Sequence, residues 1–107
     1  MPVVHIEYDN KKINEKSALE LSKEAHEIIS SITGIEDVPV YTNSSQITVE
    51  ISPIEIFIQL SGHKIKDRDK LTADLKEGFI KWRKDNNFSH PINMTLIPMD
   101  WKIEIGI

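Results

Sequence analysis

The sequence predicts an α/β protein of the α+β kind, in which two successive βαβ halves form one four-stranded mixed sheet with two helices on one face. Two observations lead to this prediction. Segments with apolar residues at every second position surround two longer segments with helical periodicity. A shift of 52 residues also places Val4 on Ile56, and the neighbouring apolar positions follow in the same phase. Tandem βαβ units place their strands in one sheet and their helices on one side of it.

The length of 107 residues corresponds to one domain, which we expect to span residues 1–107 with halves of about 1–52 and 53–107. A net charge of −4 argues against the basic face that nucleic-acid-binding proteins carry. The absence of cysteine excludes disulfides and thiolate metal sites, and it fits a reducing compartment. There is no signal-peptide pattern and no apolar run near the roughly 18 residues that span a membrane. We therefore expect a soluble cytoplasmic protein with no nucleic-acid or membrane partner.

The first half opens with a strand over residues 3–8 and continues with a helix over residues 15–32. The strand is predicted because apolar and polar side chains alternate, which is the period of a half-buried strand. Asn14 can cap the start of the helix, and Gly34 is a good stop because glycine adopts the left-handed conformation easily. Between them runs an apolar stripe at helical spacing: Ala18, Leu21, Ala25, Ile28, Ile29 and Ile32.

The second strand of the first half has two candidate positions, at residues 38–42 or at residues 47–52. The first position offers a short apolar stretch, whereas the second alternates Ile47, Val49 and Ile51 with polar residues. The choice between them stays open at this point, and it affects the topology.

The second half begins with an alternating strand over residues 54–60. Asp67 can cap a second helix that ends near residues 85–87. Strands are then predicted over residues 92–97 and 101–107, where apolar and polar residues alternate again. The buried stripe of the second helix is expected to comprise Leu71, Leu75, Gly78, Phe79 and Trp82.

A ferredoxin-like βαββαβ fold is the alternative architecture, and the position of the second strand separates the two folds. If that strand is residues 47–52, only Ser52 and Pro53 separate its last apolar residue, Ile51, from Ile54 of the next strand, and a hairpin would join neighbouring strands. If it is residues 38–42, the chain has room to cross to the other half of the sheet. The ferredoxin-like alternative would make this protein a small binding or regulatory module without enzymatic activity.

Pro2 stands directly behind the initiator methionine and at the head of the first strand. One interpretation is structural, because the first position of a strand tolerates a residue that cannot donate to the ladder. The other is chemical: removal of Met1 would leave Pro2 with a free secondary amine. Desolvation and a nearby cation both lower the pKa of an amine, and a general base works best with a pKa near the operating pH. Lys12 is the candidate cation.

A Met-Pro start that runs into an amphipathic strand, followed by a second equivalent βαβ half, resembles the tautomerase superfamily. That group includes 4-oxalocrotonate tautomerase, 5-carboxymethyl-2-hydroxymuconate isomerase and macrophage migration inhibitory factor. The stretch from Ile54 to Trp82, together with Ile97-Pro98-Met99, also resembles an uncharacterised bacterial family with this fold. The resemblance covers nearly the whole chain as architecture, whereas its motif is the single residue Pro2.

The resemblance implies a tautomerase or isomerase that needs no cofactor and uses Pro2 as the general base in a keto–enol proton transfer. It further implies a homotrimer with its sites at subunit contacts, and a small-molecule substrate such as an anionic keto or enol acid. Lys12 stands where 4-oxalocrotonate tautomerase has an arginine, so it would hold an anionic group as a point charge. The arginine of the family's second strand has no counterpart here, and Tyr41 would donate a hydrogen bond in its place.

Motifs for metals, nucleotides and other catalytic chemistry are absent from the sequence. No two histidines stand at the spacing of a metal-ligand pair, so we expect no metal site. The glycines are isolated, which excludes the glycine-rich phosphate loops. The four histidines are His5, His26, His63 and His90.

Overall fold

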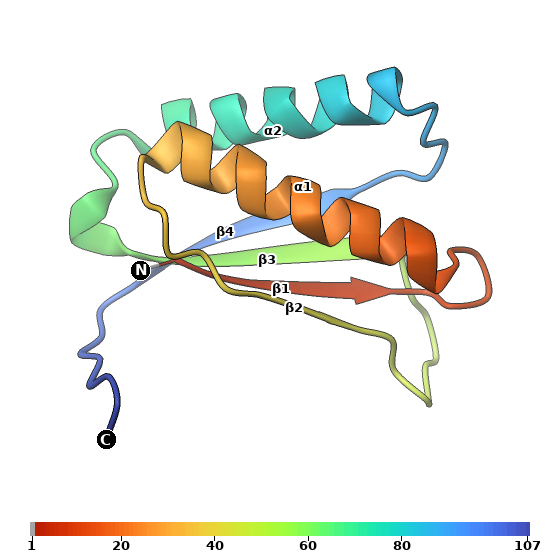
Figure 1. Ribbon diagram of the computed structural model, residues 1–107, viewed down its shortest axis with the longest axis horizontal. Coiled ribbons are helices and arrows are strands. Elements are labelled where there is room, and N and C mark those ends of the chain that lie inside the picture. Colours follow the sequence, from red (N-terminus) through yellow and green to blue (C-terminus); the bar gives the residue numbers. More distant parts are fainter. Residues whose placement is uncertain (1) are drawn as a thin grey trace.

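The computed structural model describes residues 2–107 as a four-stranded sheet with two helices packed on one of its faces (Figure 1). The strands lie in the order β2-β1-β3-β4, and a short 3-10 turn, η1, connects β3 to α2. The elements are β1 (Val3–Tyr8), α1 (Glu15–Thr33), β2 (Val40–Asn43), β3 (Ile54–Ser61), η1 (Gly62–Lys64), α2 (Arg68–Asp85) and β4 (Asn93–Met99).

The sheet confirms the predicted fold class, a mixed sheet built from two βαβ halves. Strand β1 pairs in parallel with β2, and β3 pairs in parallel with β4, so each half supplies two neighbouring strands. The halves meet where β1 and β3 pair antiparallel, with Ile6 opposite Ile56. The ferredoxin-like alternative is wrong, because β1 separates β2 from β3 and no hairpin joins them.

The second strand lies at Val40–Asn43, so the position at residues 38–42 is correct and the position at 47–52 is wrong. The strand predicted at residues 101–107 is also wrong, because no strand forms there. Both segments alternate as strands do, but neither lies beside a sheet edge that accepts its hydrogen bonds. Their apolar side chains are left in solvent, with Ile47 89% exposed and Ile105 81% exposed.

The core lies between the sheet and the helices, as the apolar stripes predict. The even-numbered residues of β1 and β3 point toward the helices and are buried, except for the partly buried Tyr8, in keeping with the two-residue period of a strand. Asn14 caps α1 by accepting a hydrogen bond from the backbone N–H of Ser17 at 2.7 Å, and Gly34 ends the helix with a φ of 73°. Asp67 caps α2 by accepting from the N–H of Lys70 at 3.0 Å.

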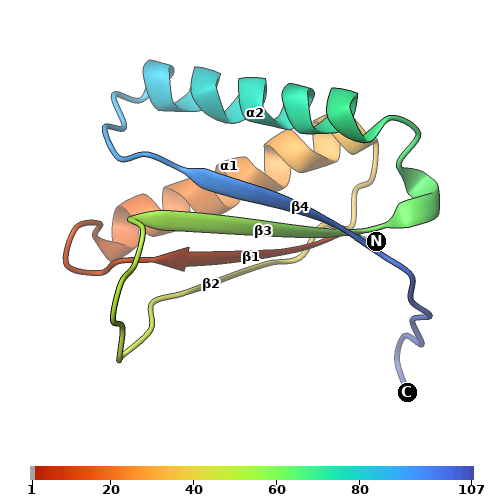
Figure 2. The same ribbon diagram turned by 180° about the vertical axis from the view of Figure 1, so that it is seen from behind.

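Helices α1 and α2 lie side by side on one face of the sheet (Figure 2). Gly78 of α2 is a point where they approach closely. A Cβ atom built on Gly78 would lie 2.8 Å from Cγ2 of Ile28, which is closer than nonbonded carbon atoms approach. Ile28 is buried in the core, and its branched side chain has little freedom to turn away. Gly78 therefore sets the distance between the two helices.

We expect Gly78→Ala to destabilise the protein by about 1 kcal/mol, although alanine is the better helix former. The gain in helix propensity is about 1 kcal/mol, and overpacking of a filled core costs about 1–3 kcal/mol. Urea unfolding followed by circular dichroism measures the difference. Glu77→Ala at the neighbouring exposed position is the control, with an expected change within about 0.5 kcal/mol.

The double variant Gly78→Ala/Ile28→Ala identifies the cause. Removal of Cγ2 from residue 28 opens the space for the new methyl group, so the Gly78→Ala change should no longer destabilise in that background. Stabilisation by Gly78→Ala in the otherwise native chain would contradict the close contact.

Candidate active site

Pro2 lies at one end of the sheet, which we call the Pro2 end: β1 begins there, and β3 and β4 end there (Figure 2). Val3 pairs with Gln59, so Pro2 comes level with Leu60 of the next strand. On the other side, the backbone N–H of Val4 donates to the carbonyl of Pro39 at 3.0 Å. The side chain of Pro2 is fully buried.

The surroundings of Pro2 are apolar. Leu60 and Val38, which flank Pro2 on the β3 and β2 sides, are each at least 95% buried. Such an environment has a low dielectric constant and disfavours a charged amine. Met1, on whose removal the chemical interpretation of Pro2 depends, lies outside the residues that the structure describes.

Lys12 lies at the opposite end of the sheet from Pro2, in the turn that follows β1. Its backbone N–H donates to the carbonyl of Asp9 at 3.1 Å, and its side chain is exposed. Strand β1 separates the two residues by about 20 Å at the usual rise per strand residue. The structure therefore does not bring Lys12 and Pro2 of one chain together.

Tyr41 lies on β2, and its ring stacks on His5 with 5.5 Å between the ring centroids. Both residues occupy the face of the sheet that the helices leave uncovered, and Tyr41 is 54% exposed. Pro2 continues the alternate residues of β1 that face the helices. It precedes His5, the residue paired with Tyr41, by three positions. Tyr41 and Pro2 of one chain thus lie on different faces.

Lys64 is the cation that sequence reasoning missed. It ends η1 directly after β3, at the Pro2 end, and Lys66 follows two residues later. The signal was present in the repeat: the shift of 52 residues that places Val4 on Ile56 also places Lys12 on Lys64. Lys12 follows β1 and Lys64 follows β3. Because these two strands are antiparallel, the two lysines lie at opposite ends of the sheet.

Ser61 and His63 form a hydrogen-bonded pair at the Pro2 end, with 2.7 Å between the serine Oγ and the histidine Nδ1. Ser61 is buried at the end of β3, whereas His63 is exposed in η1. The sequence gives only a weak signal for this pair, the break in strand pattern at Ser61-Gly62. The pair supplies a titratable group close to the end of the sheet where Pro2 lies.

Residues 2–107 offer neither a cluster of metal-ligating side chains nor a membrane-spanning helix. No three histidine or acidic side chains in this part of the chain converge on a point where a metal ion would be held. Neither described helix combines the length and the hydropathy of a membrane span.

Sequence comparison finds no matching family model and no matching curated protein. Comparison of structures does find relatives. A macrophage migration inhibitory factor-like protein from Entamoeba histolytica matches with a TM-score of 0.61 at 18% identity, over 96% of this chain and 93% of that one. A 5-carboxymethyl-2-hydroxymuconate delta-isomerase matches with a TM-score of 0.64 at 6% identity, over 99% and 89% of the two chains.

A protein of the DUF1904 group from Sebaldella termitidis matches over all of this chain and 98% of its own, with a TM-score of 0.63 at 12% identity. This chain has the same fold as these three neighbours. The predicted resemblance is therefore confirmed for the architecture. Structural matches at such low identities establish the fold alone. The chemistry has to be argued from the residues of this chain.

Proposed function

We propose that this protein is a cofactor-independent tautomerase or isomerase that transfers a proton on a small enolisable carbonyl compound. The observation that supports this most directly is the position of Pro2: a buried proline directly after Met1, among apolar neighbours, at the start of a central strand. The isomerase and the migration inhibitory factor-like protein among the structural neighbours agree with such a role.

In this mechanism the Pro2 amine, freed by removal of Met1, is the general base. The side chain of Pro2 is buried, and desolvation of an amine disfavours its charged form, which is the direction that a general base requires. The amine takes a proton from the carbon next to the carbonyl, and the electron pair moves into an enol or enolate. Return of the same proton at another position of the conjugated system completes the reaction without an oxidant or reductant.

The anionic group of the substrate would be held by lysines. Lys64 belongs to the same chain and the same end of the sheet as Pro2. Lys12 and Tyr41 can join the site only from a neighbouring subunit, because within one chain they lie at the far end and on the other face. The proposed site is therefore one that two chains would build together.

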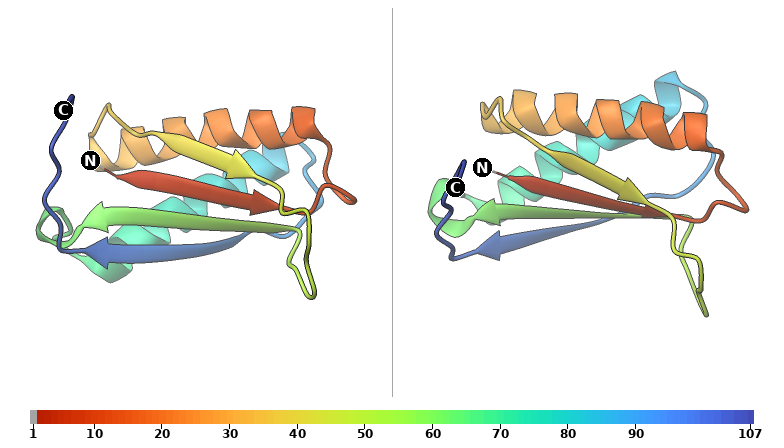
Figure 3. Two further views of the ribbon diagram at one scale, coloured as in Figure 1. Left: turned by 90° about the horizontal axis from the view of Figure 1, so that it is seen from below. Right: turned by 60° about the horizontal axis from the view of Figure 1, so that its bottom comes forward.

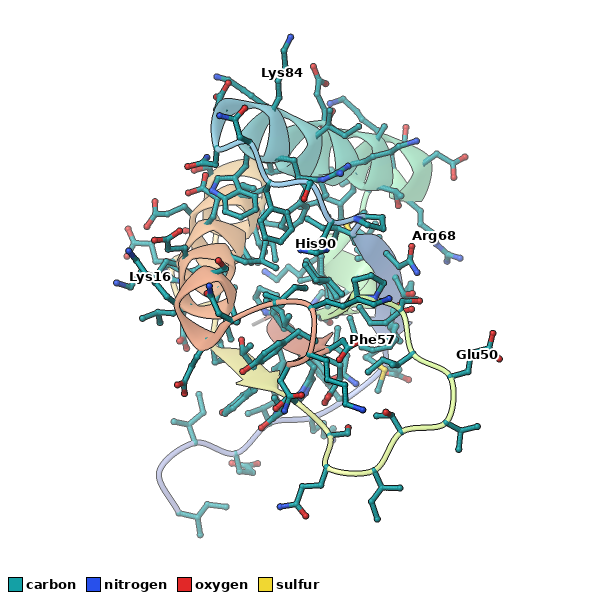
Figure 4. The ribbon with its side chains drawn as sticks, turned by 90° about the vertical axis from the view of Figure 1, so that its right-hand side faces the viewer. Lys16, Glu50, Phe57, Arg68, Lys84 and His90 are labelled. Atoms are coloured by element: carbon teal, nitrogen blue, oxygen red, sulfur yellow. The ribbon has the colours of Figure 1, made fainter. Side chains whose placement is uncertain are left out.

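A homotrimer is the assembly that we propose, and the two unpaired segments support an association of copies. Residues 44–53 and the segment after β4 both leave the sheet on the side that lacks helices, at opposite ends (Figures 1 and 3). Glu50 points away from the sheet on the first of them (Figure 4). Each segment alternates apolar and polar residues, so each can add as a strand to the sheet of another copy.

Replacement of Pro2 by alanine should lower kcat/KM for phenylpyruvate or 2-hydroxymuconate by at least about 100-fold, since a positioned general base contributes about 10²–10⁴-fold. Initial rates of ketonisation or isomerisation, followed by absorbance, measure the effect. Intact-mass analysis of each preparation shows whether Met1 is absent, because a retained methionine converts the Pro2 nitrogen into an amide.

Pro53→Ala is the matched control for this experiment. Pro53 precedes β3 as Pro2 precedes β1, but its nitrogen is always an amide, so its loss should leave the rate unchanged. Equal rates for the Pro2→Ala and native proteins would refute the mechanism. A native protein without Met1 and without turnover would instead support the non-catalytic binding or regulatory module.

Mixing of inactive variants tests whether Lys12 acts from a neighbouring subunit. We expect Lys12→Ala and Pro2→Ala to be impaired as separate proteins, whereas trimers reassembled from equal amounts should regain about a quarter of the native activity by random assortment of subunits around a ring. Full activity of Lys12→Ala alone, or no recovery in the mixture, would remove Lys12 from the site.

Ile105→Asp should convert the trimer to monomers in sedimentation velocity, because it places a charge on the apolar side of the segment after β4. Ile80→Asp is the matched control, since Ile80 is a half-exposed apolar residue on α2, away from the uncovered face of the sheet. Dissociation by both substitutions, or by neither, would contradict the proposed interface.

A further inference from the structure

A hollow of about 510 Å³ opens between the end of α1, the end of β3 and the start of α2. Its volume is within the range of about 300–1,000 Å³ that is usual for small-molecule sites. Pro2, Lys12 and Tyr41 are not among the residues that line it. The hollow shares Lys64 with the proposed proton-transfer site, whereas its other lining residues take no part in that site.

The inner wall of the hollow is aliphatic and comes from every element around it. The one hydroxyl in the lining, that of Thr33, is already occupied: it donates to the carbonyl of Ile29 at 2.6 Å and accepts from the N–H of Ile35 at 3.2 Å. This wall can therefore contact an apolar group but offers no free hydroxyl. Its aliphatic side chains are those of Ile32, Ile35, Leu60, Ile65 and Leu71.

The charged side chains around the hollow leave an excess of positive charge. Lys70 pairs with Asp74 at 2.9 Å, and the hydrogen bond with Asp74 raises the pKa of Lys70. The carboxylate of Asp67 accepts the backbone N–H of Lys70 as the cap of α2. Within residues 2–107, neither Lys64 nor Lys66 takes part in an ion pair. Two lysines thus remain available beside an aliphatic wall.

The geometry points to a binding site in this hollow for a small organic anion with an apolar body, of the kind represented by a medium-chain carboxylate. The apolar chain lies against the aliphatic wall and is removed from water, which drives the binding. The carboxylate stays at the rim, where Lys64 and Lys66 donate charge-assisted hydrogen bonds. Binding of this anion requires no proton transfer at Pro2, so it can be measured whether or not the proposed reaction takes place.

Octanoate is the probe, and amide chemical-shift titration of the full chain is the measurement. We expect saturable shifts confined to the residues that line the hollow, and none from 1-octanol or acetate at equal concentration. Each of these controls lacks one half of the proposed recognition, the charge or the chain. Lys66→Glu should weaken octanoate binding about two- to fivefold, as expected for one exposed charge pair. The double variant Lys64→Glu/Lys66→Glu should weaken it about tenfold or more.

Lys76→Glu is the matched control, because it makes the same charge change on the exposed surface of α2 outside the hollow. It should leave the affinity for octanoate unchanged. The proposal is overturned if octanoate does not saturate by about 10 mM, if Lys76→Glu weakens binding as much as Lys66→Glu, or if the shifts map elsewhere. Thermal unfolding of each variant verifies that all four proteins are folded.

Discussion

The antiparallel pairing of β1 with β3 is the constraint on which the rest of this structure depends. It joins two βαβ halves through their first strands and places the beginning of one strand against the end of the other. The same arrangement brings the end of α1 beside the start of α2, because each helix runs back along its own strand. Pro2, the Ser61–His63 pair, Lys64 and the aliphatic hollow all gather at one end of the sheet for this single reason.

The sequence alone predicts most of the fold, because the buried faces repeat with clear periods. Five elements were found close to their true bounds: β1, α1, β3, α2 and β4. The position of the edge strand β2 could not be decided from the sequence, since four residues are too few to show a period against the surrounding polar chain. At residues 47–51 and 101–107 the opposite happened: the alternation predicted strands that do not form. Alternation describes the side chains of a strand, whereas pairing requires a free edge at the right place, which the sequence does not reveal.

The site was less predictable than the fold, because it depends on relations between the halves. Pro2 was selected from its position alone, and its role as a base stays a prediction to which the structure adds the burial of its side chain. Lys12 was selected by its distance along the chain from Pro2. Strand β1 lies between the two residues, so Lys12 lies at the far end of the sheet from Pro2 of the same chain. Selection of Lys64 from the sequence would have required knowing that β1 and β3 are antiparallel. The shift of 52 residues between the two halves does not give the relative direction of these strands.

The repeat also explains why the two ends of the sheet are not equivalent chemically. At the far end, Pro53 precedes β3 and its carbonyl accepts the N–H of Asp9 at 3.0 Å, beside the turn that carries Lys12. That end has a proline and a lysine in related places, but an internal proline has no amine to titrate. Only the Pro2 end can combine a prolyl amine with lysines of its own chain. A role for Lys12 in proton transfer therefore requires a second subunit, so catalysis through Lys12 and the association of chains must succeed or fail together.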